Sequence, residues 1–366
     1  MSETSPPSTG DRDRDEREDF PRPFSRSGGS TVPESAHTGD QIEPGMPFEI
    51  SEEMALAYEQ GVDLEARSHW AYARKRFVRH RLAMASLVLL VIIITAGMFA
   101  NKVAPYKFDA IDLVNTQAPP TIHGKETVDI ATGQTTTGKP HFFGTDLLGR
   151  DYFSRVLYGV RTSARVAFVV ASLSTIIGTA IGAIAGYFGG WIDNLLMRIT
   201  DLILTVPGLA ILLVASAFLG NGSPYRVAVI LALLFWTALA RIVRGSFLSL
   251  REKEFVEAAK ASGSGDFRII VKHMLPNTLG PIIVTATLTV AAAILIEAVL
   301  SFLGFGIQPP TPALGKLISD GQGQMIEAWW LVTFPGLVIV AIVLCINFIG
   351  DGLRDALDPT QRKVSA

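Results

Sequence analysis

Apolar residues gather in six long runs, and polar segments separate them. The runs cover residues 82–100, 164–188, 202–220, 226–243, 279–304 and 331–350. An α-helix needs roughly 20 mainly apolar residues to cross a bilayer, and each run approaches that length. The pattern therefore predicts an all-α, polytopic membrane protein with six transmembrane helices.

The second and fifth runs are rich in Ala, Gly, Ser and Thr. Small side chains let helix backbones approach closely, so we predict that these two helices lie inside the bundle rather than against lipid. Pro207, Pro281 and Pro335 fall within the third, fifth and sixth runs. Neighbouring groups can satisfy the carbonyls that a proline frees, so we expect all three helices to continue through them. Residues 191–201, before the third run, predict a surface helix.

Basic residues before the first run decide the predicted orientation. Residues 67–81 carry six Lys and Arg, and such flanks stay on the cytoplasmic side. Six crossings then place both termini in the cytoplasm of a multi-pass plasma-membrane protein, with 101–163 and 305–330 outside. The loop between the fourth and fifth runs lies inside, with seven Lys and Arg between residues 241 and 272. The 101–163 region also carries seven, but over a longer stretch, where the rule counts for less.

Composition agrees with a membrane protein, because 49% of the residues are hydrophobic and only 18% are charged. The net charge of −2 conceals a segregation: residues 1–66 contain sixteen Asp and Glu against five Arg. Such a segment buries too little apolar surface to offset chain entropy, so we predict a disordered acidic tail over 1–66. We assign 67–100 to a basic juxtamembrane segment with the first helix, 101–160 to an external segment, and 352–366 to a C-terminal tail.

The most polar long run in the second half of the chain is EFVEAAKASGSGDFRIIVKHMLPN, residues 254–277. Residues 251–261 favour a helix, and the glycines of 262–265 interrupt it. We expect Asp266 to cap a second helix, which Pro276 ends before the fifth run. This second helix should carry one apolar face, made of Phe267, Ile270, Val271 and Met274. A solvated loop is the alternative, but connections usually span about four to six residues, so this length favours a docking surface.

The stretch 254–277 also carries a spaced motif: Glu257-Ala258-Ala259, then Gly263 after three residues, and Leu275-Pro276 at its end. It resembles the EAA loop of ABC importer permeases, and His273 before Met-Leu-Pro-Asn is similar to the peptide and nickel branch. The resemblance implies that this coupling loop, residues 254–277, docks on an ATPase subunit. The coupling residues implied in this way are Glu257, Ala258, Ala259, Gly263, Leu275 and Pro276.

Residues 141–168, 297–318 and 350–362 resemble the C-type permease subunits of dipeptide and oligopeptide importers. The resemblance implies a type I ABC importer permease fold, with the permease domain over 161–351. It also implies a heterodimer with a second, B-type permease, two ABC ATPase subunits and an extracytoplasmic binding protein. The cargo would be di- or oligopeptides, with nickel chelates, glutathione or another small solute left open.

Other chemistry finds little support in the residues. The Walker pattern G-x-x-x-x-G-K-[ST] does not occur, so ATP and Mg would be bound by partner chains and this chain holds no cofactor. The six His are scattered and the lone Cys345 excludes a cysteine-based zinc site, so neither a metal nor a catalytic residue is expected. No nucleic-acid partner is expected. An ion channel is disfavoured because neither a carbonyl filter nor an Arg repeat is present.

Glu297 lies in the outer part of the fifth run, and an ionisable residue there is a functional candidate. One reading places its carboxyl at the external interface or against a neutralising neighbour. The other makes it part of the substrate pathway or of an external gate.

Overall fold

The computed structural model describes residues 69–124, 126–128, 135–137, 139–219 and 223–357. The predicted acidic tail, 1–66, lies outside the described residues, as does most of the C-terminal tail. Helices dominate the described part, together with one small antiparallel hairpin of strands β1 (Glu126–Val128) and β2 (Thr135–Thr137), in which Glu126 pairs with Thr137. The helices, in chain order, are α2 (His69–Arg79), α3 (Arg81–Met98), α4 (Ala100–Val103), α5 (Tyr152–Phe188), α6 (Gly190–Thr205), α7 (Gly208–Leu219), α8 (Pro224–Arg251), α9 (Glu254–Ala261), α10 (Asp266–Arg268), α11 (Leu275–Phe302), α12 (Leu314–Gly321) and α13 (Trp330–Leu357).

Five helices of the described chain are long and apolar enough to cross a membrane, or six if the bent pair α6–α7 is one span. The five are α3, α5, α8, α13 and the continuous helix Asp266–Phe302, which contains α10 and α11. The 18 residues of α3 extend about 27 Å, close to the thickness of a bilayer's apolar layer. α5 begins at Tyr152, because the Asp151 carboxylate accepts the Ser154 N–H at 2.8 Å and caps it. Residues 152–160 are therefore helical, although the apolar pattern assigns them to the external segment.

The third run is not the continuous helix that the sequence predicts. α6 ends at Thr205, α7 begins at Gly208, and the two helices meet at 86°. Pro207 stands at the bend, where it has no N–H to donate and its ring excludes the preceding turn. The expectation that the helix continues through proline is thus wrong here, whereas it is confirmed at Pro281 in α11 and at Pro335 in α13. The surface helix predicted over 191–201 is the first part of α6.

Close packing of α5 on α8 follows from glycines one turn apart on α5. A Cβ added at Gly182 would lie 2.4 Å from the Ala240 carbonyl oxygen, and Gly178 and Gly186 face α8 equally closely. The small residues of the second run therefore do hold a helix inside the bundle. Of the most apolar window of each helix, 39% is buried within the chain in α5, 28% in the Asp266–Phe302 helix of the fifth run and 56% in α8.

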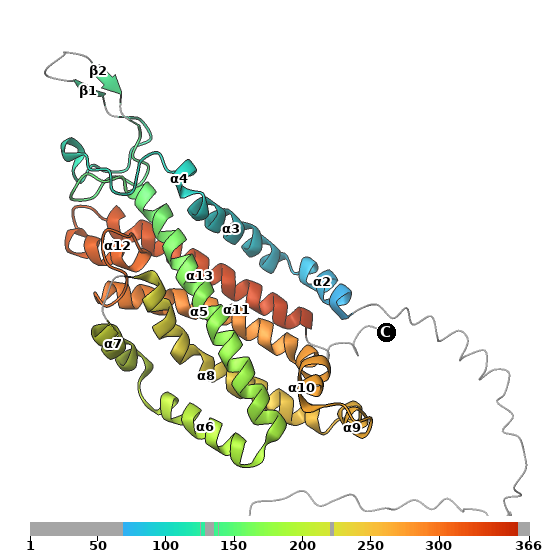
Figure 1. Ribbon diagram of the computed structural model, residues 1–366. Helices are drawn as coiled ribbons and strands as arrows, with labels where there is room; N and C mark the ends of the chain where they lie inside the picture. Colours follow the sequence, from blue (N-terminus) through green and yellow to red (C-terminus); the bar gives the residue numbers. More distant parts are fainter. Residues whose placement is uncertain (1–68, 125, 129–134, 138, 220–222, 358–366) are drawn as a thin grey trace, which may run out of the picture. The chain divides into compact units, whose positions relative to one another are not determined.

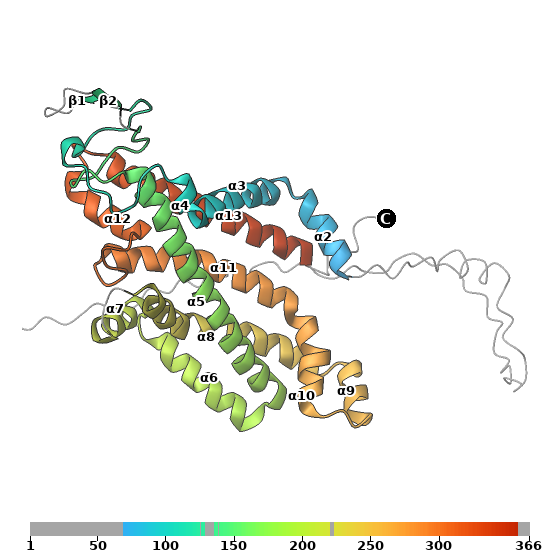
Figure 2. The ribbon, with the colours of Figure 1, turned by 45° about the horizontal axis from the view of Figure 1, so that its top comes forward.

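The bundle has two ends, each with its own buried cluster (Figures 1 and 2). At the α12 end, the first halves of α5 and α8 pack with the later part of α11, with α12 and with α13. At the α9 end, the last turns of α5 and α8 pack with α9 and with the start of the Asp266–Phe302 helix. The basic helix α2 contacts α13 and lies towards the α9 end in both views.

Candidate functional site

The coupling loop begins with the two-turn helix α9, which a glycine closes. Gly263 has φ +74°, its N–H donates to the Lys260 carbonyl at 2.9 Å, and the Ser264 N–H donates to the Ala259 carbonyl at 3.1 Å. This pair of bonds is a Schellman motif, which requires a left-handed residue after the helix. Gly263, predicted as a docking residue, therefore has a structural task as well: it turns the chain away from α9.

One face of α9 is buried and the other is free within this chain. Val256 is fully buried and Ala259 is 8% exposed, and both join the cluster that contains Phe247 of α8. Glu257 and Ala258 are exposed. The predicted coupling residues thus divide: Ala259 attaches α9 to the bundle, while Glu257 and Ala258 face outward.

Tyr187, at the end of α5, holds both halves of the coupling loop. Its hydroxyl donates to Asp266 Oδ1 at 2.6 Å, and Lys260 Nζ of α9 lies 5.6 Å from the centre of its ring. Its carbonyl accepts from Arg251 Nη1 at 3.3 Å. Asp266 is therefore not the helix cap that the sequence predicts, because Gly265 occupies that position and the carboxylate faces Tyr187. Sequence reasoning missed Tyr187, whose only signal is a phenol ending an apolar run.

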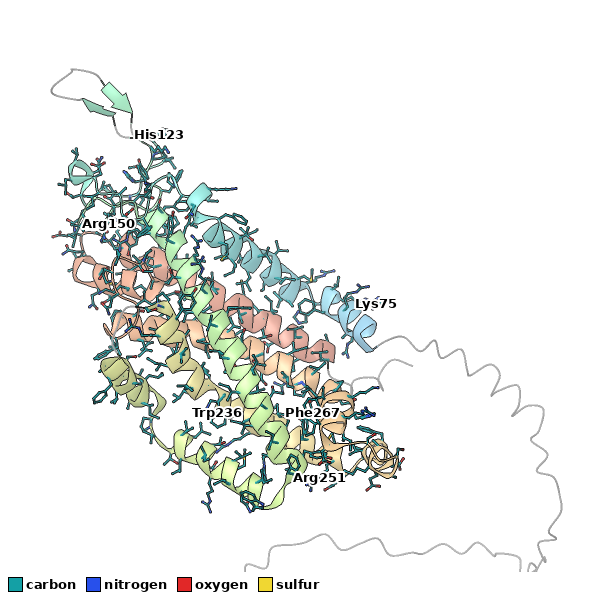
Figure 3. The ribbon with its side chains drawn as sticks, in the orientation of Figure 1. Lys75, His123, Arg150, Trp236, Arg251 and Phe267 are labelled. Atoms are coloured by element: carbon teal, nitrogen blue, oxygen red, sulfur yellow. The ribbon has the colours of Figure 1, made fainter. Side chains whose placement is uncertain are left out.

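The segment after Asp266 differs from the predicted amphipathic helix. Residues Ile269–Met274 form a π-helical turn, and the helix continues into α11 instead of ending at Pro276. Bonds from residue i to i+5 widen the turn, so the 3.6-residue period no longer selects the buried face. Ile269 and Met274 are buried, whereas Phe267 is 80% exposed. Figure 3 shows Phe267 at the α9 end of the bundle.

The two remaining predicted coupling residues lie just after this turn, at the start of α11. Leu275 is half-buried against the cluster at the α9 end, and Pro276 is exposed in the first turn of α11. The His273 carbonyl accepts from the Asn277 amide at 2.6 Å. Exposed apolar and charged side chains therefore lie along one segment: Phe255, Glu257, Phe267, Val271 and Pro276.

Asp146 organises the opposite end of the molecule. Its Oδ1 accepts from the N–H groups of Leu148 and Arg150, both at 2.9 Å. Its Oδ2 accepts from Arg150 Nε at 2.8 Å and from Arg155 Nη1 at 2.5 Å. The two ion pairs fold the 145–151 loop over the start of α5, and Arg155 is buried there.

A second buried pair lies beside it. His141 Nδ1 is 2.8 Å from Asp151 Oδ1, and the other Asp151 oxygen accepts from Ser154. The Tyr106 ring stacks on His141 with centroids 4.8 Å apart. Partial burial, followed by the charge of Asp151, raises the pKa of the Tyr106 phenol above its ordinary value. The Tyr152 hydroxyl donates to the Leu331 carbonyl at 2.6 Å and ties this region to α13.

Glu297 is fully buried in the interior of the bundle. Its carboxyl accepts from Ser163 Oγ of α5 at 2.9 Å and from Ser301 Oγ one turn along α11 at 2.6 Å. The two serine hydroxyls are its hydrogen-bond donors among the described residues, and neither of the two readings is decided by these contacts. Among the described residues no group of three or more His, Cys, Asp or Glu could hold a metal ion, and Cys345 is buried.

Comparison with known families defines the class of protein. Residues 178–363 match the family described as binding-protein-dependent transport system inner membrane component. Residues 68–120 match the N-terminal TM domain of oligopeptide transport permease C. The chain belongs to the family of binding-protein-dependent transport system inner membrane components.

Two similar proteins are named as peptide permeases. The chain is 40% identical over 291 residues to the oligopeptide transport system permease protein OppC of Mycobacterium bovis, covering 79% of this chain and 94% of the relative. It is 40% identical over 297 residues to the dipeptide transport system permease protein DppC of Alkalihalophilus pseudofirmus, covering 81% and 92%. A solved structure of the MetNI methionine ABC transporter is similar at 20% identity and a TM-score of 0.46, covering 56% of this chain and 96% of that one.

Proposed function

We propose that this chain forms half of a translocation pathway for di- and oligopeptides, and that ATP hydrolysis on partner subunits drives it. One observation carries the proposal: α9 presents Glu257 and Ala258 outward while Val256, Ala259 and Tyr187 fix it to the bundle. A helix held in this way offers another protein a rigid surface to bind. The similarity to an oligopeptide permease and to a dipeptide permease supports the peptide cargo.

The α9 end is proposed to face the cytoplasm. The helix α2, which carries the exposed Arg74, Lys75 and Arg79, lies towards this end, and so does the coupling loop with Lys253 and Lys260. Basic flanks stay on the cytoplasmic side of a membrane, so this distribution supports an N-terminus inside. The last turn of α13 lies near α2, which supports a C-terminal segment on the same side.

The remaining subunits would supply what this chain lacks. A second permease would form the other half of the pathway, and two ATPases would bind ATP and Mg, one of them against the coupling loop. A binding protein would deliver cargo to the α12 end. Closure of the ATPases would then move the coupling loops together and shift the bundle between two accessible states. The chain itself would perform no catalysis.

The experiment is a charge reversal on the exposed face of α9. Glu257→Arg in the complete transporter should abolish co-purification of the ATPase subunits and uptake of a labelled peptide, because it reverses the charge that the partner meets. Glu327→Arg changes an exposed glutamate outside the coupling loop and should leave ATPase co-purification intact. ATPase binding and uptake at wild-type levels in Glu257→Arg would contradict the proposal.

A further inference from the structure

A basic groove lies against the first half of α5, towards the α12 end of the bundle. It encloses about 590 Å³, and α5 contributes Tyr158, Arg161, Thr162 and Arg165 to its wall. These residues recur at three- and four-residue spacing, so they share one helix face. The opposite wall comes from Lys107 in the segment after α4 and from Thr311 before α12. Figure 2 shows this part of α5 between α4 and α12.

The groove continues past Arg165. A second cavity of about 220 Å³ shares Thr162, Arg165 and Thr311 with the first and extends to Tyr225 at the start of α8. The second cavity is partly apolar, because Val166, Val169 and Ala228 also line it. A further groove, which Arg165 lines together with Leu90, Ile94 and Phe168, is almost wholly apolar.

The charges in this groove are unbalanced. Lys107, Arg161 and Arg165 are three cations, whereas Asp109 is the one acid that lines it among the described residues. Arg161 Nη1 donates to Asn101 Oδ1 at 3.3 Å, but its Nε is buried and has no hydrogen-bond partner among the residues that the structure describes. Arg165 is exposed and makes no hydrogen bond or ion pair within the described chain.

The buried Arg161 Nε is costly unless an acceptor in the groove reaches it, and the exposed Arg165 charge needs water or protein beside it. A buried donor without an acceptor loses its hydration without compensation. An arginine on the apolar part of a transmembrane helix faces protein or water rather than lipid, since lipid would penalise its charge. The two guanidinium groups are one helical turn apart, and planar guanidinium groups bind carboxylates with two parallel hydrogen bonds.

We propose that Arg161 and Arg165 form a binding subsite for the carboxylate of the transported solute, at the entry to the pathway half that this chain builds. The inference rests on the proposed function, and it adds which residues meet the cargo and which group they recognise. For a peptide this group is the C-terminal carboxylate, with Tyr158 and Thr162 beside it.

The test compares two cargoes in the complete transporter with its binding protein, reconstituted in proteoliposomes. The probes are tri-alanine and tri-alanine amide, which differ only in the terminal carboxylate. Arg161→Gln and Arg165→Gln should each lower uptake of the acid roughly tenfold, as expected for a lost charge-assisted hydrogen bond, and leave the amide unchanged. Arg165→Lys should recover part of the loss. Lys102→Gln removes an exposed charge of α4 outside the groove and should have no effect.

Stimulation of ATPase activity by the loaded binding protein is measured as well. It shows whether a variant still assembles and still docks the binding protein, so a defect in the subsite can be told from a defect in assembly or docking. If the wild type imports only the acid, a fall in acid uptake with stimulation intact supports the subsite. Equal losses for acid and amide, no loss, or a loss that follows the anionic lipid content of the vesicles would overturn it. Release of the second permease from Arg165→Gln would overturn it too, because Arg165 would then be an interface residue. A wild type that imports neither probe would instead contradict the proposed peptide cargo.

Discussion

Substitutions at Gly263 separate two effects on the coupling loop: the backbone conformation of this residue and its contact with a partner protein. Its φ of +74° closes α9, and a Cβ added there would meet no heavy atom of the described part of the chain within 4 Å. A side chain at this position therefore costs only the left-handed backbone penalty, about 1–2 kcal/mol for an ordinary residue. A loss of 1.4 kcal/mol changes the population of the turn about tenfold. Asn tolerates the left-handed region best after Gly, and a β-branched residue tolerates it least.

The expected order of function is therefore Gly, then Gly263→Asn, then Gly263→Ala, then Gly263→Val. The assay has two parts: limited proteolysis at the exposed Lys260 and Arg268, which reports opening of the loop, and peptide uptake with ATPase co-purification. Proteolysis and uptake should follow the same order. If Gly263→Asn loses ATPase binding more than Gly263→Ala while proteolysis is unchanged, side-chain size decides the outcome. The backbone explanation would then be refuted, and Gly263 would lie in contact with the partner.

Three further substitutions test other contacts. Tyr187→Phe keeps the ring under Lys260 but removes the bond to the exposed Asp266 carboxylate, so the coupling loop should open more readily by about 1 kcal/mol, measured as faster proteolysis after Lys260. Asp146→Asn leaves buried Arg155 without its carboxylate, which should cost about 3–5 kcal/mol and remove the assembled protein from membranes; wild-type amounts would contradict this. Gly182→Leu should lower the thermal midpoint of the solubilised complex by forcing α5 off α8, at about 1–3 kcal/mol, whereas an unshifted midpoint would disprove the close packing.

Apolar periodicity was sufficient to locate five spans, because the bilayer length constrains any helix that crosses it. The apolar pattern did not predict the bend at Pro207, but it correctly predicted continuous helices through Pro281 and Pro335. All three lie in apolar runs, so only the packing of the flanking residues decides whether a proline bends the helix. In the coupling loop, the glycine break and the helix before it were predicted. The π-turn was not, because a change from 3.6-residue periodicity has no mark in the sequence.

The contacts that position the candidate site depend on residues far apart in the chain. Tyr187 and Asp266 are 79 positions apart, and Ser163 and Glu297 are 134 apart. No local sequence pattern links the two residues of either pair. Each residue alone shows only that a polar group lies at a helix end or inside a span, so neither pairing could be predicted. The Asp146 network is more local, since Arg150 and Arg155 follow within nine positions. Its role still requires the fold, which buries Arg155 at the start of α5.

The position of Tyr187 explains how a two-turn helix could transmit force to a whole bundle. α9 is connected to the ends of α8 and of the Asp266–Phe302 helix by only a few residues on each side. Tyr187 adds α5 to this pair, since its hydroxyl and ring reach Asp266 and Lys260. From that point the glycines of α5 pack directly on α8, and a close-packed contact resists deformation. A displacement of α9 would therefore act on α5, α8 and the Asp266–Phe302 helix together. The helix α3 packs on α5 and α13, away from the coupling loop. Weakening Tyr187 should reduce coupling more than it reduces assembly, because the α5–α8 contact remains in place.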